Sequence, residues 1–171
     1  MTVDPEVLFV ANQSRLFRYF LRAVGQIETA RDLTQDVFVR VSRTAVPQAP
    51  DGEVRAWLFR IARNLALDHH RRHQRQPLPV TRAVDAGRPP SQEVDAAVNE
   101  ALASLPDLDR DVFLMREMAG LGYDDIARAC DLTPDAVRSR IHRTRMQLRS
   151  RLAAPIAKRR TLSMRHSGRE T

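Results

Sequence analysis

The side chains best suited to chemistry in this 171-residue chain form a basic and polar run between residues 138 and 143. Guanidinium, hydroxyl and imidazole groups donate hydrogen bonds to base edges and phosphate oxygens, and arginine pairs with both in a bidentate way. No acidic residue follows Asp135 until Glu170, so nothing nearby in the sequence neutralises the run. The pattern indicates a nucleic-acid contact, against the plainer alternative of a solvated basic face. The candidate residues are Arg138, Ser139, Arg140, His142 and Arg143.

The elements that position this run are predicted to form a helix-turn-helix within residues 105–152. Thr133 is a good N-cap, and Pro134 falls at the first helical position, where proline is tolerated. A short helix over residues 123–130 precedes the turn, after a break at residues 120–122. Such an arrangement places a longer basic helix in the DNA major groove. A buried stripe at helical spacing supports that second helix, formed by Val137, Ile141, Leu148 and Leu152.

A second basic region follows a predicted turn at residues 50–52, in a helical stretch over residues 53–75. Its apolar side carries Val54, Trp57, Leu58, Ile61 and Leu65. Its arginines are expected to be exposed or nearly so: Arg60, Arg63, Arg71, Arg72 and Arg75. The chain thus has two candidate nucleic-acid surfaces.

Two histidines in this stretch, His69 and His73, are four residues apart and lie close to Asp68, so a metal site has to be weighed. Zinc and iron sites need a third and a fourth ligand, and no further His or Cys follows at suitable spacing. We therefore predict no metal, and we expect these histidines to lie beside a phosphate backbone.

Two helices are predicted ahead of this stretch, over residues 5–24 and 27–44. Asp4-Pro5 repeats the start in which a capping residue precedes proline. The second helix has an inner stripe of Ala30, Leu33, Val37, Phe38 and Val41. Its other face is mostly polar, and from the residues alone it is expected only to be solvated: Asp32, Gln35, Asp36, Val39 and Arg40.

Residues 76–91 break every periodic pattern and contain four of the chain's ten prolines. Such a segment is typical of a linker. We therefore predict an all-α protein with two small helical domains, residues 1–75 and 92–153, joined by a flexible linker. The basic tail over residues 154–171 is predicted to be disordered.

The charge of the chain points to a polyanionic partner, since the formal net charge is +7 and the sequence pI is about 11.0. Only one of the 28 basic residues is a lysine, Lys158. The excess of arginine fits recognition of phosphates and guanines, and a bias in genome composition would produce it equally well.

Several classes of protein are disfavoured. The single cysteine, Cys130, excludes an intramolecular disulfide and is expected to be a small buried residue. No signal peptide opens the chain and no apolar run approaches the roughly 20 residues that cross a bilayer, so we predict a cytoplasmic protein without membrane insertion. Neither a phosphate-binding glycine loop nor a nucleophile–base pair is present, which argues against an enzyme and against a cofactor.

Three segments in order resemble the extracytoplasmic-function branch of the sigma-70 sigma factors, the promoter-recognition subunits of bacterial RNA polymerase. They read DLTQDVFVRV, then RAWLFRIARNLALDHHRR, then LPDLDRDVFLMREMAGLGYDDIARACDLTPDAVRSRIHRTR. The resemblance covers about residues 8–75 and 95–152. It implies an RNA polymerase core as partner, contacted through its β′ clamp helices and β flap, together with promoter DNA and an anti-sigma factor.

The resemblance also assigns roles to the candidate residues. The polar face of the second helix matches the surface that docks on the β′ clamp helices, and the run from Arg138 to Arg143 matches the reader of the −35 element. Asn64 is placed at a helix-ending position that captures a flipped-out base. The residues that match the −10 reader are Arg60, Arg63, Asn64, Asp68, His69, Arg71 and Arg72.

The chain departs from the family pattern at two places. Gly122 stands where many relatives have Ser or Thr, and few aromatic side chains lie near Asn64, since Trp57 is expected in the core. An autonomous, dimeric helix-turn-helix regulator is the alternative function. That alternative explains residues 105–152 equally well, but not the second basic region or the polar helix.

Overall fold

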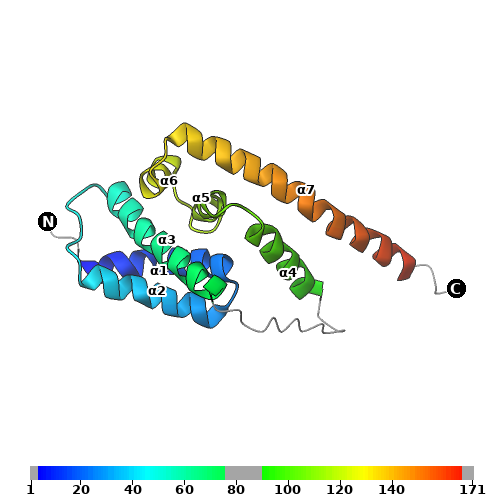
Figure 1. Ribbon diagram of the computed structural model, residues 1–171, viewed down its shortest axis with the longest axis horizontal. Coiled ribbons are helices and arrows are strands. Elements are labelled where there is room, and N and C mark those ends of the chain that lie inside the picture. Colours follow the sequence, from blue (N-terminus) through cyan, green and yellow to red (C-terminus); the bar gives the residue numbers. More distant parts are fainter. Residues whose placement is uncertain (1–3, 76–89, 167–171) are drawn as a thin grey trace.

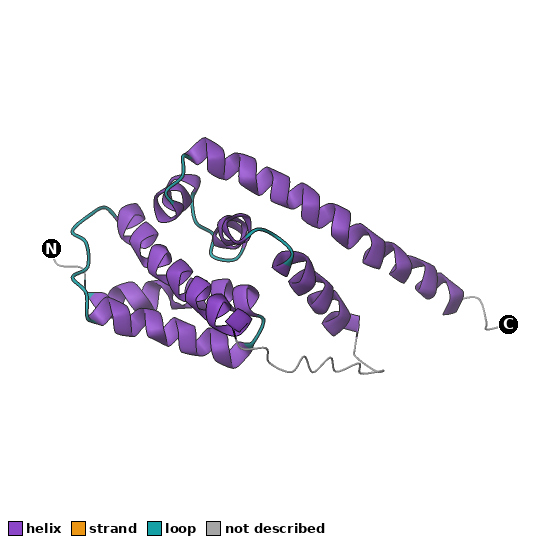
Figure 2. Ribbon diagram, viewed as in Figure 1, coloured by secondary structure: helices purple, strands orange, loops and turns teal. Residues whose placement is uncertain are grey.

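The computed structural model describes residues 4–75 and 90–166, and within these ranges every regular element is an α-helix (Figures 1 and 2). The predicted all-α class is confirmed. The helices are α1 (Pro5–Val24), α2 (Ile27–Ser42), α3 (Asp51–Arg75), α4 (Pro90–Ala103), α5 (Asp107–Glu117), α6 (Tyr123–Cys130) and α7 (Pro134–His166).

The predicted starts of α1 and α7 are confirmed by their capping contacts. Asp4 Oδ1 accepts a hydrogen bond from the backbone N–H of Glu6 at 2.9 Å. Thr133 Oγ1 accepts one from the N–H of Ala136 at 3.2 Å. Each contact satisfies a backbone donor that the first turn of a helix leaves free, so the local sequence fixes where both helices begin.

The turn of the helix-turn-helix depends on a backbone conformation that few residues adopt. Asp131, which ends α6, has φ 55° and ψ 46°, and its N–H bonds to the carbonyl of Ala127. Aspartate tolerates this left-handed region better than most residues. The chain therefore changes direction within three residues, and α7 begins at Pro134.

Several predicted boundaries need correction. Residues 51 and 52, predicted as part of a loop, form the first turn of α3, because the N–H groups of Glu53 and Val54 both bond to the carbonyl of Pro50. α4 begins at Pro90, where proline is favoured at the first helical position, instead of Gln92. Residues 76–89 of the predicted linker lie outside the described residues.

The predicted disordered tail also begins too early. α7 continues to His166, through Pro155, although the basic tail from residue 154 was expected to be disordered. Proline removes one backbone donor, but the alanine, lysine, arginine, leucine and methionine residues around it have high helix propensity. The backbone therefore remains helical, and only residues 167–171 of the tail lie outside the described residues.

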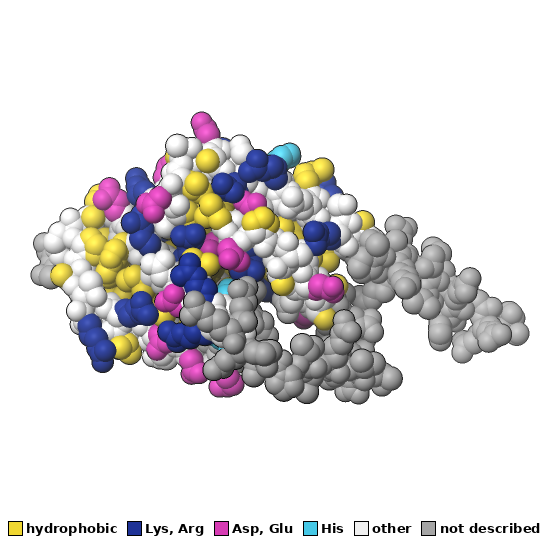
Figure 3. Space-filling model, in the orientation of Figure 1, with side chains coloured by type: hydrophobic (Ala, Val, Ile, Leu, Met, Phe, Trp, Pro, Cys, Tyr) yellow, Lys and Arg dark blue, Asp and Glu magenta, His cyan; other side chains and the backbone are white. Residues whose placement is uncertain are grey.

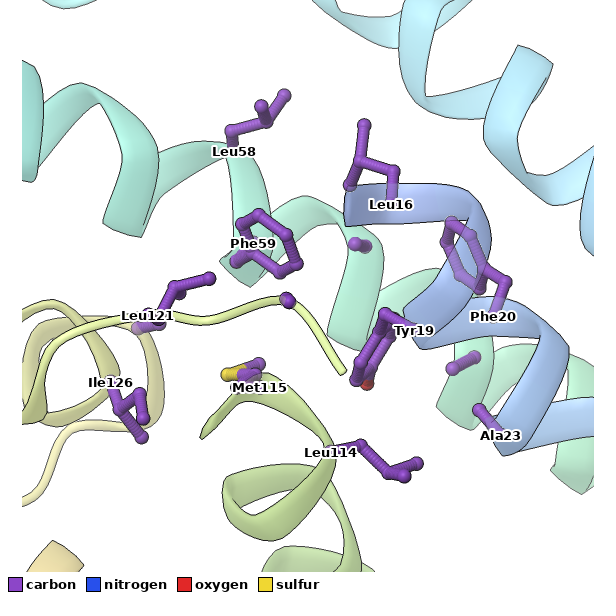
Figure 4. Packing of buried hydrophobic residues seen from close by; sticks show 14 of the residues in the cluster. Leu16, Tyr19, Phe20, Ala23, Leu58, Phe59, Leu114, Met115, Leu121 and Ile126 are labelled. Carbon is purple, nitrogen blue, oxygen red and sulfur yellow. The ribbon is translucent and has the colours of Figure 1, made fainter. Parts of the chain in front are cut away.

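The two halves of the chain pack against one another. α5 and α6 lie between α7 and the first three helices, with α1 against α5 and α3 against α6 (Figure 1). Their buried side chains form one continuous core, in which Tyr19 and Phe59 of the first half meet Leu114, Met115 and Leu121 of the second (Figure 4). This contact between the halves was not predicted from the sequence.

Candidate nucleic-acid interface

The long helix α7 presents most of the predicted polar run on its outer side. Arg138, Ser139, His142 and Arg143 are all exposed. The opposite side is anchored in the core by Val137, Ile141 and Leu148, and also by Thr144, whose exposed fraction is 1%. Thr144 lies one turn beyond Ile141 and completes the stripe that the apolar residues alone left interrupted.

Arg140 does not belong to this outer surface. Its guanidinium bonds to Asp109 Oδ1 of α5 at 2.5 Å, and the side chain is only 28% exposed. Residue 140 precedes the buried Ile141 and Thr144 by one and four positions, so it lies at the edge of the core-facing stripe. Arg140 was predicted among the −35 contacts because charge and position in the run do not distinguish it from the exposed arginines.

The second basic surface, on α3, is partly covered by the helix-turn-helix. The Nη2 atom of Arg60 donates to Asp131 Oδ1 at 2.7 Å and also to the carbonyl oxygen of Arg128. Arg55 forms an ion pair with Asp125 at 3.5 Å. Figure 3 shows arginine and acidic side chains side by side over the centre of one face of the molecule. Acidic residues of the second half thus lie against arginines of the first.

A buried polar cluster lies beneath these surface pairs. Asp111 of α5 is 1% exposed, and its two carboxylate oxygens accept hydrogen bonds from Arg63 Nε at 3.0 Å and from the Tyr19 hydroxyl at 3.1 Å. Burial raises the pKa of Asp111, and the Arg63 guanidinium opposes that rise. Burial, and next the Asp111 carboxylate, raise the pKa of Tyr19 well above its usual value.

Sequence reasoning missed the role of Asp111, although a signal was present. Its position is three residues before Leu114 and four before Met115, on the apolar side of α5. A carboxylate in a buried stripe needs a partner, which Arg63 and Tyr19 provide from the other half of the chain. Arg63 was predicted to be exposed, yet its side chain is only 22% exposed.

The remaining residues predicted to read the −10 element lie along the later turns of α3. Asn64, Arg71 and Arg72 are exposed, while Asp68 and His69 are half-buried. The His69 and His73 rings are 4.1 Å apart between centroids, and burial, followed by the charge of His73, lowers the pKa of His69.

The expected helix end at Asn64 is wrong, because α3 continues for eleven further residues to Arg75. Leu65 and Ala66, directly after Asn64, are buried in the core and hold this part of the helix in place. Asn64 therefore presents its amide from the middle of a helix.

The polar face of α2 is exposed to solvent in the part of the chain that the structure describes. Asp32, Gln35, Asp36, Val39 and Arg40 are all exposed, whereas Leu33 and Val37 on the opposite side are buried. Val39 is 39% exposed, so an apolar group lies among the charges of this face.

Within residues 4–75 and 90–166, no three His, Cys, Asp or Glu side chains gather as a metal site would require. No helix there combines the length and the apolar character needed to cross a membrane.

Comparisons with known proteins agree with this geometry. Residues 8–76 match the family model described as Sigma-70 region 2, and residues 95–148 match Sigma-70, region 4. The ECF RNA polymerase sigma factor SigE of Mycolicibacterium smegmatis is 36% identical over 153 residues, which cover 81% of this chain and 58% of that relative. The RNA polymerase sigma-H factor of Pseudomonas aeruginosa is 29% identical over 157 residues, covering 82% of this chain and 81% of that relative.

Solved structures show the same fold. CnrH, in complex with the cytosolic domain of CnrY, superposes with a TM-score of 0.67 at 26% identity, covering 88% of each chain. The sigma factor RpoE of Bartonella quintana, in complex with the anti-sigma factor NepR, has a TM-score of 0.63 at 21% identity, covering 86% of this chain and 93% of that one. The region 2 match contains α1 to α3 and the region 4 match contains the helix-turn-helix. This chain belongs to the extracytoplasmic-function branch of the sigma-70 family of RNA polymerase sigma factors, which are not enzymes.

Proposed function

We propose that this chain binds the core of RNA polymerase in the cytoplasm and directs it to promoters, reading the −35 element with α7 and the −10 element with α3. The observation that carries the proposal is the outer face of α7. A capped helix in the region 4 match presents Arg138, Ser139, His142 and Arg143 to solvent, while its other side is anchored in the core. Helix-turn-helix domains read the major groove with such a face.

The exposed face of α2 is the surface that we propose for docking on the β′ clamp helices. It lies within the region 2 match and combines the carboxylates of Asp32 and Asp36 with the apolar Val39. The region 4 half is proposed to contact the β flap. An anti-sigma factor is a further proposed partner, supported by the description of the Bartonella quintana structure.

Reconstitution with purified core polymerase tests the function. The chain should co-elute with core on gel filtration and support run-off transcription from a subset of random promoter fragments. Sequencing the products would then show −35 and −10 elements at fixed spacing. Dimeric binding to a palindrome without polymerase, combined with no run-off product, would instead establish the autonomous regulator.

We also propose that the form described here is the one that precedes promoter binding. Arg60 and Arg63 are less available to DNA while Asp131 and Asp111 hold them, because Arg60 Nη2 and Arg63 Nε already donate to these carboxylates and the Arg63 side chain is only 22% exposed. The acidic side chains of the second half also place negative charge beside these arginines, and this charge repels phosphates. Promoter reading by α3 therefore requires the two halves to separate.

Asp131→Asn tests this separation at an exposed position. The amide keeps the left-handed backbone accessible and removes the charge that holds Arg60. Asp124→Asn is the matched control, since Asp124 is an exposed aspartate of the same helix-turn-helix. We expect association of the Asp131→Asn holoenzyme with an immobilised promoter fragment to be up to about fivefold faster, the ceiling for an exposed ion pair. Equal association rates for both variants and the unmodified chain would argue against a closed form that must open.

A further inference from the structure

Tyr123, the first residue of α6, lies next to the recognition helix and has no role in the function proposed so far. Two guanidinium groups lie over its ring. The Cζ of Arg116, from α5, is 4.7 Å from the ring centroid, and the Cζ of Arg138, from α7, is 5.2 Å away. Both distances fall within the roughly 6 Å over which a cation is attracted to the face of an aromatic ring.

Tyr123 and Arg116 are held firmly enough to act as a support. Arg116 Nη1 donates to the carbonyl oxygen of Leu121 at 2.8 Å, and Leu121 itself is completely buried. Tyr123 is half-buried and packs against the core, and the next turn of its helix is anchored by the buried Ile126. The ring therefore has a fixed position relative to the start of α7.

Arg138 is the more exposed of the two arginines over the ring, with 59% of its side chain exposed. It also forms an ion pair of 2.7 Å with Asp135 in the first turn of the same helix. An exposed arginine loses considerable rotamer freedom when it binds DNA, and holding it in place beforehand reduces that cost. The ring can supply this order without using any guanidinium N–H donor, so the donors other than those of Nη1, which bonds to Asp135, stay available for a base or a phosphate.

We propose that Tyr123 is a positioning residue for −35 recognition, which acts by holding the Arg138 guanidinium in the orientation that DNA requires. The inference rests on the proposed function. It extends the recognition surface from α7 to a residue of α6 and to Arg116 of α5, neither of which belongs to the predicted DNA-binding run. Tyr123 acts here through its aromatic face, so its hydroxyl is dispensable.

The substitutions Tyr123→Leu and Tyr123→Phe separate this role from simple packing. Leucine keeps an apolar side chain but has no ring, and phenylalanine keeps the ring but has no hydroxyl. The measurement is binding of holoenzyme to a promoter fragment that the unmodified holoenzyme selects in run-off transcription. We expect Tyr123→Leu to weaken binding about two- to fivefold, the range for an exposed cation–π contact, and Tyr123→Phe to bind like the unmodified chain.

A double-mutant cycle with Arg138→Ala identifies the residue through which Tyr123 acts. Without the guanidinium there is nothing left to position, so Tyr123→Leu should have no further effect in the Arg138→Ala background. The salt dependence of Tyr123→Leu should equal that of the unmodified chain, because no positive charge has been removed. Thermal unfolding is measured alongside, and Tyr123→Met replaces the leucine variant if the latter does not fold.

Three results would overturn the inference. One is the same loss of affinity in both backgrounds, which is what a packing role would produce. Another is a loss in Tyr123→Phe as large as in Tyr123→Leu, which would assign the role to the hydroxyl. The third is unchanged binding of Tyr123→Leu. If the unmodified holoenzyme selects no promoter at all, the proposed function fails together with the inference, and the reference measurement shows this before any variant is compared.

Discussion

Arg140 and Arg143 are three residues apart on α7, yet their surroundings give them different roles. Arg140 is bound to Asp109 at the edge of the core, while Arg143 is exposed on the outer face. The two side chains carry the same charge and belong to the same basic run, so neither property distinguishes their roles. At the scale of single residues, the side of the helix decides whether an arginine holds the fold or can reach DNA.

Substitution of both arginines by alanine tests this difference. We expect Arg143→Ala to cost about 1–3 kcal/mol of binding to the preferred −35 sequence and to relax preference at one base pair, because an exposed guanidinium on this face can read a guanine edge. A library of −35 substitutions, transcribed at two salt concentrations, measures both effects. If Arg143 holds a phosphate instead, affinity falls evenly across the library and the salt slope shrinks by about one.

Arg140→Ala should act mainly on stability. Its removal leaves Asp109, which is 18% exposed, without its partner, and we expect a loss of about 1 kcal/mol in the free energy of unfolding. Sequence preference within the −35 library should stay the same. If Arg140→Ala instead relaxed the preference at one base pair and left stability unchanged, Arg140 would contact the −35 element.

Cys130 gives a prediction about chemical reactivity. The thiol is buried, and burial raises its pKa to about 11. At pH 8 the native thiol should therefore react with iodoacetamide only as fast as the protein unfolds, whereas the unfolded chain should react readily. Mass spectrometry of samples quenched with and without denaturant measures both rates. Equal rates in the two samples would contradict this burial.

The same pKa shift has a consequence for alkaline stability. In the unfolded state the thiol ionises from its ordinary pKa of 9.0, whereas in the folded state it ionises only near 11. The shift in the pKa of Cys130 therefore contributes to the free energy of unfolding in full below pH 9.0, and this contribution is lost as the pH rises towards 11. Cys130→Ala should show a shallower loss of stability across that interval.

At the scale of elements, the start of α7 determines whether the recognition residues face outward. Thr133 satisfies the N–H of Ala136, and we expect Thr133→Ala to lower the free energy of unfolding by about 1 kcal/mol, the usual cost of losing an N-cap. Thr133→Ser keeps the hydroxyl and should retain most of that stability. Urea unfolding followed by circular dichroism measures both variants, and an equal loss in the two would mean that the hydroxyl does not contribute.

The outer face of α2 is the surface proposed to dock on core polymerase, and its charge can be reversed at Asp36. Asp36 is exposed, so Asp36→Arg should change stability by no more than about 0.5 kcal/mol. Binding to core polymerase should nevertheless weaken, because the charge of the proposed docking face is reversed. Glu6→Arg is a suitable control, since it reverses an exposed charge on α1. Wild-type affinity of Asp36→Arg for core would remove this face from the docking surface.

Local sequence predicted the elements well where caps and periodicity are strong. The bounds of α6 and the starts of α1 and α7 follow from Asp4, Gly122 and the Thr133-Pro134 pair. The helix ends were less predictable, because a proline such as Pro155 weakens a helix without always ending it. The placement of Arg63 could not be predicted, since its partner, Asp111, is 48 residues away in the sequence.

At the scale of the whole molecule, the shared core should make the two halves unfold together. Tyr19, Phe59 and Leu114 lie in one buried cluster, and removing one partner of a buried ion pair typically costs about 3–5 kcal/mol. We expect a single calorimetric transition for the unmodified chain. Asp111→Ala should destabilise the contact between the halves and split the transition in two. Two transitions in the unmodified chain would show that the halves unfold independently.

Because the contact between the two halves is apolar, their separation should increase the heat capacity of the protein. Separation would bring Phe59, Met115 and Leu121, now almost completely buried, into contact with water, and hydration of apolar surface raises the heat capacity. Apolar attraction weakens on cooling, so the open fraction should rise as the temperature falls. The apparent affinity for promoter DNA, which α3 is proposed to read only after the halves separate, scales with that fraction. Calorimetric titrations of a promoter fragment with the holoenzyme at several temperatures should therefore give a less negative heat-capacity change than the area buried at the DNA surface alone would produce.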